Sequence, residues 1–459
     1  MDAMNKRVLK LALPSILANL TVPLVGMVDI AVAGHLDASA AALIGGVSVG
    51  SLMFDLLYWN FGFLRAGTGG MTAQAFGRSD WDECVGNLRR GVGLAFVISL
   101  VLILLQWPFQ KLIFLFVGCS DEVHTLALDY FYIRIWAAPA TLTLMAFRGW
   151  FVGLQDTFSS MLTDVIVNGG NIIFSVLITF GIAGAGLDGI GFKGIAVGTV
   201  VAQYSGLIFA SAVALRKLRK FPRCPASQLD GGLTMGEVFA KDKVRRFFSV
   251  NRDLFVRSVC LIIVYLAYIA ISAGFGDTLL ASCSIMLKLL LLFSYFTDGF
   301  AFAGEALTGR FVGMRWPSMV RLTVDYTFGW SMGIAVILVF IYAFFGDSLL
   351  RLLTSDPAVV SASHQFMPWL FLFPLVSCPA FTWDGIYTGA TATKPMRDSN
   401  IGCVAAFFAV WFLGNLLLPG QVTPSVSAHL LFAAYYAHVI YRSLYQSFLY
   451  RRSILAPLR

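Results

Sequence analysis

Long apolar runs alternate with short polar segments along the whole chain. Most runs hold about 20 or more residues with few charges, enough to cross about 30 Å of hydrocarbon as a helix. Of all residues, 58% are hydrophobic and 13% are charged, against about 25% charged in soluble domains. We therefore expect an all-α polytopic membrane protein with 12 transmembrane helices, near residues 8–34, 38–64, 91–117, 123–153, 162–182, 190–215, 254–275, 278–308, 322–345, 359–389, 400–418 and 426–450.

Lysine and arginine are concentrated in alternate polar segments. The other side of the predicted membrane retains Lys111, Lys193 and Arg351. Because basic loops stay in the cytoplasm and the number of spans is even, we expect both termini to be cytoplasmic. This placement also explains the net charge of +8 without a nucleic-acid partner.

The two halves of the chain repeat each other. Arg148, Gly149 and Gly153 in FRGWFVGLQDT correspond to Asp384, Gly385 and Gly389 in WDGIYTGATAT, 236 positions later. Thr72 and Gly77 correspond to Thr308 and Gly313 at the same separation. Tyr58, Gly62, Phe63 and Gly67 correspond to Tyr295, Gly299, Phe300 and Gly304 at a separation of 237 residues. The repeat predicts two six-helix lobes, 1–215 and 253–459, joined by a cytoplasmic basic linker at 216–252. Each lobe has an even number of helices, so the repeats are parallel, with a pseudo-two-fold axis along the membrane normal.

One carboxylate stands out in the first predicted helix. Asp29 is the single acidic residue of residues 8–34, and Pro14 and Pro23 precede it. An ionised aspartate near the middle of a membrane helix costs about 2.5–3.5 kcal/mol, and each proline removes one helical hydrogen bond. Asp29 is therefore the candidate for binding a coupling proton or cation.

Other charges within the predicted spans are secondary candidates. Asp55 could face a cavity or pair with a basic residue. Lys288 and Asp298 are ten residues apart and lie near one helix face; Lys288 could line a C-lobe cavity that favours anions, or pair with Asp325 or another carboxylate. Asp253 and Arg257 have the i, i+4 spacing of a helical ion pair.

Four segments resemble the multidrug and toxic compound extrusion (MATE) family, specifically its DinF-type branch. They are LALPSILANLTVPLVGMVDIAVAGHL, FGFLRAGTGGMTAQAFG, DGFAFAGEALTGRFVG and WDGIYTGATATKPMRDSN. The resemblance implies a V-shaped MATE/MOP-type fold with N- and C-lobes, in the inner membrane of a prokaryote. It implies an exporter in which an ion gradient drives the expulsion of amphipathic, often cationic, organic compounds.

The resemblance also implies roles for single residues. Asp29 matches the first-helix carboxylate that takes up the coupling proton, and Pro14, with Pro23, is associated with bending of that helix. Asn171 matches the asparagine of the N-lobe polar network, to which we also assign Asp55. Some relatives carry a second carboxylate one turn after that asparagine, where this chain has the Phe174/Ser175 region.

A secondary active antiporter is the function that these features favour. The chain has no phosphate-binding loop G-x-x-x-x-G-K-[ST], and its five histidines show no metal-ligand spacing. We therefore expect no enzyme activity, no metal and no cofactor beyond the coupling ion, a proton or alternatively sodium. The expected partners are drug-like small molecules and the lipid bilayer, with the protein a monomer. The alternative function is a flippase or exporter of a lipid-linked or anionic metabolite.

Overall fold

The computed structural model describes residues 2–36, 40–115, 118–182, 187–221, 235–354, 356–417 and 423–458. The chain forms two compact units. We call Leu17–Phe248 the N-terminal unit, and Met1–Ile16 with Ser249–Arg459 the C-terminal unit. The boundary between Phe248 and Ser249 lies within the predicted linker, whose residues 222–234 fall outside the described part of the chain.

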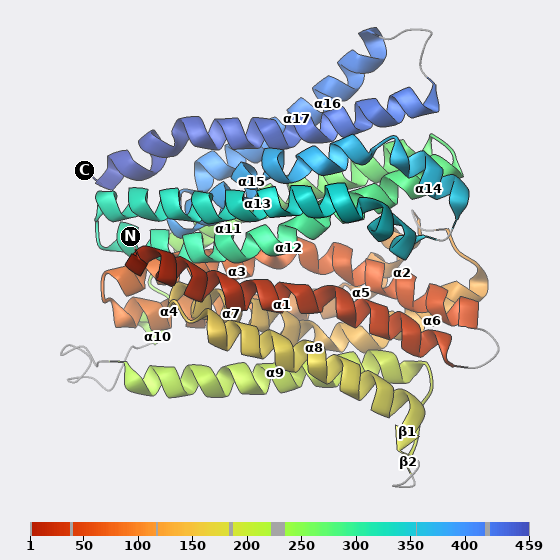
Figure 1. The fold of residues 1–459 in the computed structure, drawn as a ribbon. Helices are drawn as coiled ribbons and strands as arrows, with labels where there is room; N and C mark the ends of the chain where they lie inside the picture. Colours follow the sequence, from red (N-terminus) through yellow and green to blue (C-terminus); the bar gives the residue numbers. More distant parts are fainter. Residues whose placement is uncertain are drawn as a thin grey trace. The chain divides into compact units, whose positions relative to one another are not determined.

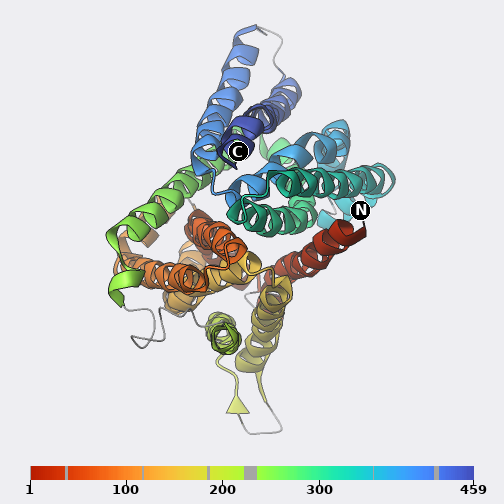
Figure 2. The same ribbon diagram turned by 90° about the vertical axis from the view of Figure 1, so that its left-hand side faces the viewer.

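The N-terminal unit is helical apart from one short hairpin. The hairpin joins α8 to α9, which lie side by side, and pairs β1 with β2 antiparallel, Gly181 opposite Asp188 (Figures 1 and 2). Its elements are α2 (Ala40–Trp59), α3 (Phe63–Gly77), α4 (Trp81–Leu104), α5 (Gln106–Phe114), α6 (Asp121–Arg134), α7 (Ala138–Gly153), α8 (Thr157–Phe180), β1 (Gly181–Ile182), β2 (Leu187–Asp188), α9 (Lys193–Lys220) and α10 (Met235–Val238).

Among the described residues, seven helices that follow α10 lie wholly or mainly in the C-terminal unit. They are α11 (Lys241–Ala273), α12 (Asp277–Gly313), α13 (Pro317–Leu353), α14 (Pro357–His364), α15 (Met367–Gly389), α16 (Thr393–Leu417) and α17 (Pro424–Tyr450). A π-helical segment, Arg451–Leu455, follows α17 directly. Both chain termini lie at the same end of this unit (Figure 1).

Two helices contribute to both units. Helix α1 (Asp2–Gly34) runs without interruption through the boundary at Ile16, so its first part belongs to the C-terminal unit and the rest to the N-terminal unit. Helix α11 does the reverse, because its residues up to Phe248 belong to the N-terminal unit. Each half of the sequence therefore begins in the unit formed mainly by the other half.

Helical segments lie over all twelve predicted spans. Ten helices of the described chain are long and apolar enough to cross a membrane. The run 121–153, in which a 3-10 turn at Ile135–Ala137 separates α6 from α7, does not meet that test of length and hydropathy. Helix α17 misses it although it has 27 residues, since tyrosine, serine and histidine lower its hydropathy. The polytopic helical prediction is confirmed.

The repeat reappears in the packing of each unit. A Cβ atom on Gly149 would lie 2.1 Å from the Arg65 carbonyl oxygen, and one on Gly385 would lie 2.0 Å from that of Ala301. These contacts join α7 to α3 and α15 to α12, and each residue of the first contact lies 236 positions before its counterpart in the second. Only glycine allows the helix backbones to approach so closely.

The turns that follow these helices repeat as well. Among the described residues, the non-glycine positions with positive φ are Ser79 (57°), Gln155 (62°), Arg315 (53°) and Thr391 (49°). They form two pairs separated by 236 residues, each just beyond the end of a helix. An uncommon backbone conformation kept at equivalent places shows that the halves share their local geometry as well as their sequence pattern.

Candidate ion-coupling site

Asp29 lies on α1 in the N-terminal unit, and its side chain is buried with 3% exposure. Its carboxylate interacts with the Ser175 hydroxyl on α8 and with the charge of Arg134 on α6. The carboxylate oxygen Oδ1 is buried without a hydrogen-bond partner among the described residues. An unsatisfied buried acceptor costs about 1–3 kcal/mol of folding free energy. A proton or a bound cation at Asp29 would reduce that cost.

Close packing of α8 on α9 holds the side chains opposite Asp29. A Cβ on Gly198 would lie 2.5 Å from the Ser175 backbone nitrogen, and one on Gly194 would lie 2.6 Å from the Thr179 Cα. The Ser175 hydroxyl can also donate to the Ile195 carbonyl oxygen at 3.3 Å. Ser175, in the Phe174/Ser175 region, thus reaches both Asp29 and α9.

Asn171 lies one turn before Ser175 and is 3% exposed. Its Nδ2 donates to Thr199 Oγ1 at 2.7 Å, and that hydroxyl donates to the Ile195 carbonyl oxygen at 3.1 Å. The Asn171 Oδ1 has no hydrogen-bond partner in the described part of the chain. Asp29 and Asn171 therefore each present one unsatisfied acceptor oxygen, and their partners Ser175 and Thr199 both donate to the Ile195 carbonyl oxygen on α9.

Arg134 is the site residue that our reasoning from the sequence missed. Its Nη1 donates to the Tyr130 hydroxyl at 2.6 Å and to Ser51 Oγ at 3.4 Å. The guanidinium also lies 4.9 Å from the centre of the Phe54 ring, a cation–π contact. The signal was present in the sequence, because an arginine within an apolar span is a functional candidate by default.

The charge of Arg134 acts on two carboxylates at once. Asp29 and Asp55 both interact with it electrostatically, yet neither carboxylate lies within the 4.0 Å of a salt bridge. Asp55 is exposed on α2, so its predicted pairing with a base takes the form of a longer-range interaction. Asp29 and Asp55 thus share the positive charge of Arg134. If one carboxylate is protonated, Arg134 interacts with the other alone.

The prolines of α1 do not end the helix, which is continuous through Pro14 and Pro23. Side chains beside them make local hydrogen bonds: Ser15 Oγ donates to the Leu11 carbonyl oxygen at 3.2 Å, and Thr21 Oγ1 donates to that of Ala18 at 2.7 Å. Thr21 also accepts a hydrogen bond from Asn168 on α8 at 2.6 Å. The bending of α1 at its prolines stays a prediction.

The buried carboxylates Asp253 and Asp384 of the C-terminal unit pair with arginines of other helices. The predicted pair of Asp253 with Arg257 is wrong: Asp253 accepts from Arg397 on α16 at 3.0 Å, and Arg257 on α11 is paired with Asp384 on α15. Arg442 on α17 approaches the same Asp384 carboxylate at 3.8 Å. Interhelical pairing prevails because it links elements of the fold and satisfies a buried carboxylate.

Lys288 lies apart from that network. Lys288 is exposed on α12, and among the described residues no carboxylate lies within 4.0 Å of its amine. It is therefore not paired with Asp325, which lies beside Arg321 and Tyr450. Asp298 is half-buried on the same helix.

These features define a class: a polytopic helical membrane protein built on an internal repeat, with a buried, incompletely satisfied carboxylate in one unit. Comparison with known proteins identifies the family. The MatE family profile matches residues 14–177 and 254–428, and the chain belongs to this family.

Individual relatives agree with the family assignment. The chain is 31% identical over 409 residues to the DNA damage-inducible protein F of Escherichia coli (strain K12), covering 89% of this chain and 85% of that protein. It is 24% identical over 408 residues to a probable multidrug resistance protein NorM of Thermotoga maritima, covering 89% and 83%. A crystal structure of MATE in the straight conformation matches with a TM-score of 0.83 and 14% identity, covering 99% and 97%. The predicted membership of the MATE family and its DinF-type branch is confirmed, and the chain is a multi-pass membrane protein of a multidrug transporter family.

Proposed function

We propose that this protein is an antiporter that exports amphipathic, cationic organic compounds in exchange for protons, with Asp29 as the protonation switch. The observation that carries the proposal is the burial of the Asp29 carboxylate with one oxygen unsatisfied. A proton on that carboxylate converts a costly buried charge into a hydrogen-bond donor. The proton gradient supplies the energy, about 2.3 kcal/mol per charge for each 100 mV.

The neighbours of Asp29 suggest how its two states differ. When Asp29 is ionised, it competes with Asp55 for the Arg134 charge, and a cationic substrate or a sodium ion could compensate the excess negative charge. When Asp29 is protonated, Arg134 is left to Asp55, and the neutral carboxyl group can donate to a nearby acceptor. The proton and the cation thus compete for the same carboxylate, so that proton uptake promotes cation release, which is the requirement for exchange.

We also propose that both termini are cytoplasmic and that the protein acts as a monomer. Both termini lie at one end of the C-terminal unit (Figure 1), as an even number of spans requires. The excess of lysine and arginine in the segments on that side supports a cytoplasmic orientation.

Transport in proteoliposomes tests the proposal. Ethidium efflux is measured under an imposed pH gradient and, separately, under a sodium gradient, with wild type and the Asp29→Asn variant. We expect the pH gradient to drive efflux in wild type and Asp29→Asn to abolish it. Asp129→Asn is the control, since Asp129 forms a half-exposed pair with Lys193 in the same unit and surface pairs contribute little. Full pH-driven efflux by Asp29→Asn would refute the switch, and efflux driven equally by sodium would refute proton specificity.

The exposed Lys288 supports one second candidate function. A basic side chain without a carboxylate partner on α12 suits an anionic or lipid-linked substrate. A fluorescent lipid-scrambling assay in the same vesicles separates the two functions. Scrambling without an ion gradient, lost in Lys288→Gln, would favour the flippase.

A further inference from the structure

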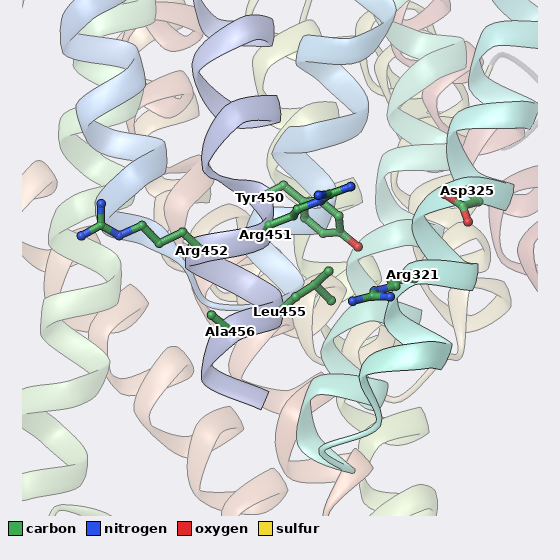
Figure 3. A pocket seen from close by; sticks show the side chains of 7 residues that line it. All are labelled: Arg321, Asp325, Tyr450, Arg451, Arg452, Leu455 and Ala456. Atoms are coloured by element: carbon green, nitrogen blue, oxygen red, sulfur yellow. The ribbon is translucent and has the colours of Figure 1, made fainter. Parts of the chain in front are cut away.

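A cavity of about 740 Å³ lies at the end of the C-terminal unit that carries both termini. The coupling site of the N-terminal unit does not account for it. Three guanidinium groups and one carboxylate give its wall a positive charge. Figure 3 shows the side chains that line it: Arg321, Asp325, Tyr450, Arg451, Arg452, Leu455 and Ala456.

The three arginines of the cavity lack carboxylate partners. Arg321, Arg451 and Arg452 are exposed, and none forms a salt bridge within 4.0 Å in the part of the chain that the structure describes. Arg257 and Arg442 in the same unit are by contrast both paired with Asp384. The cavity therefore gathers positive charge that Asp325, the one carboxylate of its lining, neutralises only in part.

A buried hydroxyl adds a hydrogen-bond donor to this charge. The Tyr450 ring packs on Trp383 with centroids 4.9 Å apart, and its hydroxyl is buried without a hydrogen-bond partner among the described residues. Figure 3 shows this hydroxyl directed toward the side of the cavity that Arg321 lines. Guanidinium groups around an unsatisfied hydroxyl form a donor set suited to a phosphate oxyanion.

The adjoining surface of α17 is apolar. Leu444 and Phe448 are exposed, Phe448 by 81%, and they are four residues apart on the helix that leads directly into Arg451 and Arg452. From Arg451 to Leu455 the backbone is π-helical, a rare geometry that is frequent at functional sites. An apolar strip that ends at a basic cavity matches the shape of a phospholipid, with acyl chains on the strip and the headgroup in the cavity.

We propose that this cavity is a binding site for an anionic phospholipid. The headgroup phosphate accepts hydrogen bonds from Arg321 and Arg451 and from the Tyr450 hydroxyl, which lie on one side of the cavity, whereas the Arg452 side chain points away from them and adds only its positive charge (Figure 3). The Asp325 carboxylate can accept a hydrogen bond from a headgroup hydroxyl such as those of phosphatidylglycerol. Basic pockets between membrane helices recognise anionic headgroups in this way.

Native mass spectrometry of the full-length protein in detergent tests the site. The protein is titrated with phosphatidylglycerol, with phosphatidylcholine of the same acyl chains, and with inorganic phosphate. We expect one phosphatidylglycerol to bind in preference to phosphatidylcholine, and inorganic phosphate not to displace it. Arg321→Gln and Arg451→Gln should each weaken binding about five-fold, which corresponds to about 1 kcal/mol per basic residue.

Two further variants separate a built site from general attraction to charge. Lys394→Gln removes an exposed charge outside the cavity and should leave binding unchanged, whereas Tyr450→Phe keeps the ring packing and should weaken binding. Equal binding of both lipids, full displacement by inorganic phosphate, or the same affinity in the arginine variants as in wild type would overturn the proposal. Because the readout is binding, its outcome is independent of whether Asp29 couples transport to protons.

Discussion

Replacing Asp384 by asparagine should destabilise the C-terminal unit strongly. The carboxylate is buried, with 9% of the residue exposed, and it neutralises Arg257 and the almost inaccessible Arg442. Gln446 Nε2 also donates to it at 3.4 Å. Asparagine is nearly the same size but neutral, so the substitution leaves two guanidinium charges without a counter-charge.

The magnitude follows from the burial of these groups. Removing one partner of a buried ion pair costs about 3–5 kcal/mol, and the lower end applies because the asparagine amide oxygen still accepts one hydrogen bond. A loss of about 3 kcal/mol lowers the Tm by about 6–12 °C for a unit of about 200 residues.

Thermal unfolding of the purified protein in detergent, followed by intrinsic tryptophan fluorescence, measures this change. Asp347→Asn is the matched control, because Asp347 also contacts two partners, Arg351 and His364, but its side chain is 50% exposed. Its Tm should stay close to that of wild type. The reasoning fails if Asp384→Asn melts within about 2 °C of wild type or no lower than the control.

Three further predictions concern the N-terminal unit. Gly149→Ala should lower the Tm, since the new methyl group meets a backbone carbonyl oxygen of α3 at 2.1 Å and overpacking costs about 1–3 kcal/mol; Gly169→Ala, where nothing lies within 4 Å, should not. Burial opposes ionisation of Asp156, but hydrogen bonds from Lys217 and Ser159 outweigh it and lower its pKa below the ordinary 3.8. Its stabilising effect is therefore present above that pH and lost as the pH falls through the lower folded-state value, so the Tm difference between wild type and Lys217→Gln should shrink in acid; a constant difference would contradict this. Arg134→Gln should abolish pH-driven ethidium efflux without loss of protein from the membrane fraction, and undiminished efflux would remove Arg134 from the coupling site.

The length of the apolar runs was sufficient to predict the helical spans, because a bilayer requires a similar apolar length of every helix that crosses it. The internal repeat was equally visible, since the close contacts of Gly149 and Gly385 accept no other residue. Asp29 stood out because few charges occur in that span.

Pairing between helices could not be predicted from spacing alone. The i, i+4 rule favoured Asp253 with Arg257, but partners on α15 and α16, more than 120 residues away in the sequence, take both. Arg134 was overlooked although it is a charge in an apolar span; its bond to Ser51 could not be predicted, because that bond forms only when α6 packs on α2. Likewise, local sequence does not indicate that the first residues of α1 join the opposite half of the chain.

The sharing of α1 and α11 has a consequence for any attempt to divide this protein. Cutting the chain between the repeats, at residues 222–234, would yield two fragments, neither of which contains a complete compact unit. The first fragment would lack residues 241–248 of the N-terminal unit, and the second would lack residues 2–16 of the C-terminal unit. Separately produced halves should therefore be unstable alone and should recover stability when produced together, as halves that complement one another. Although each half of the sequence carries its own copy of the helical repeat, each compact unit needs residues from both halves to be complete.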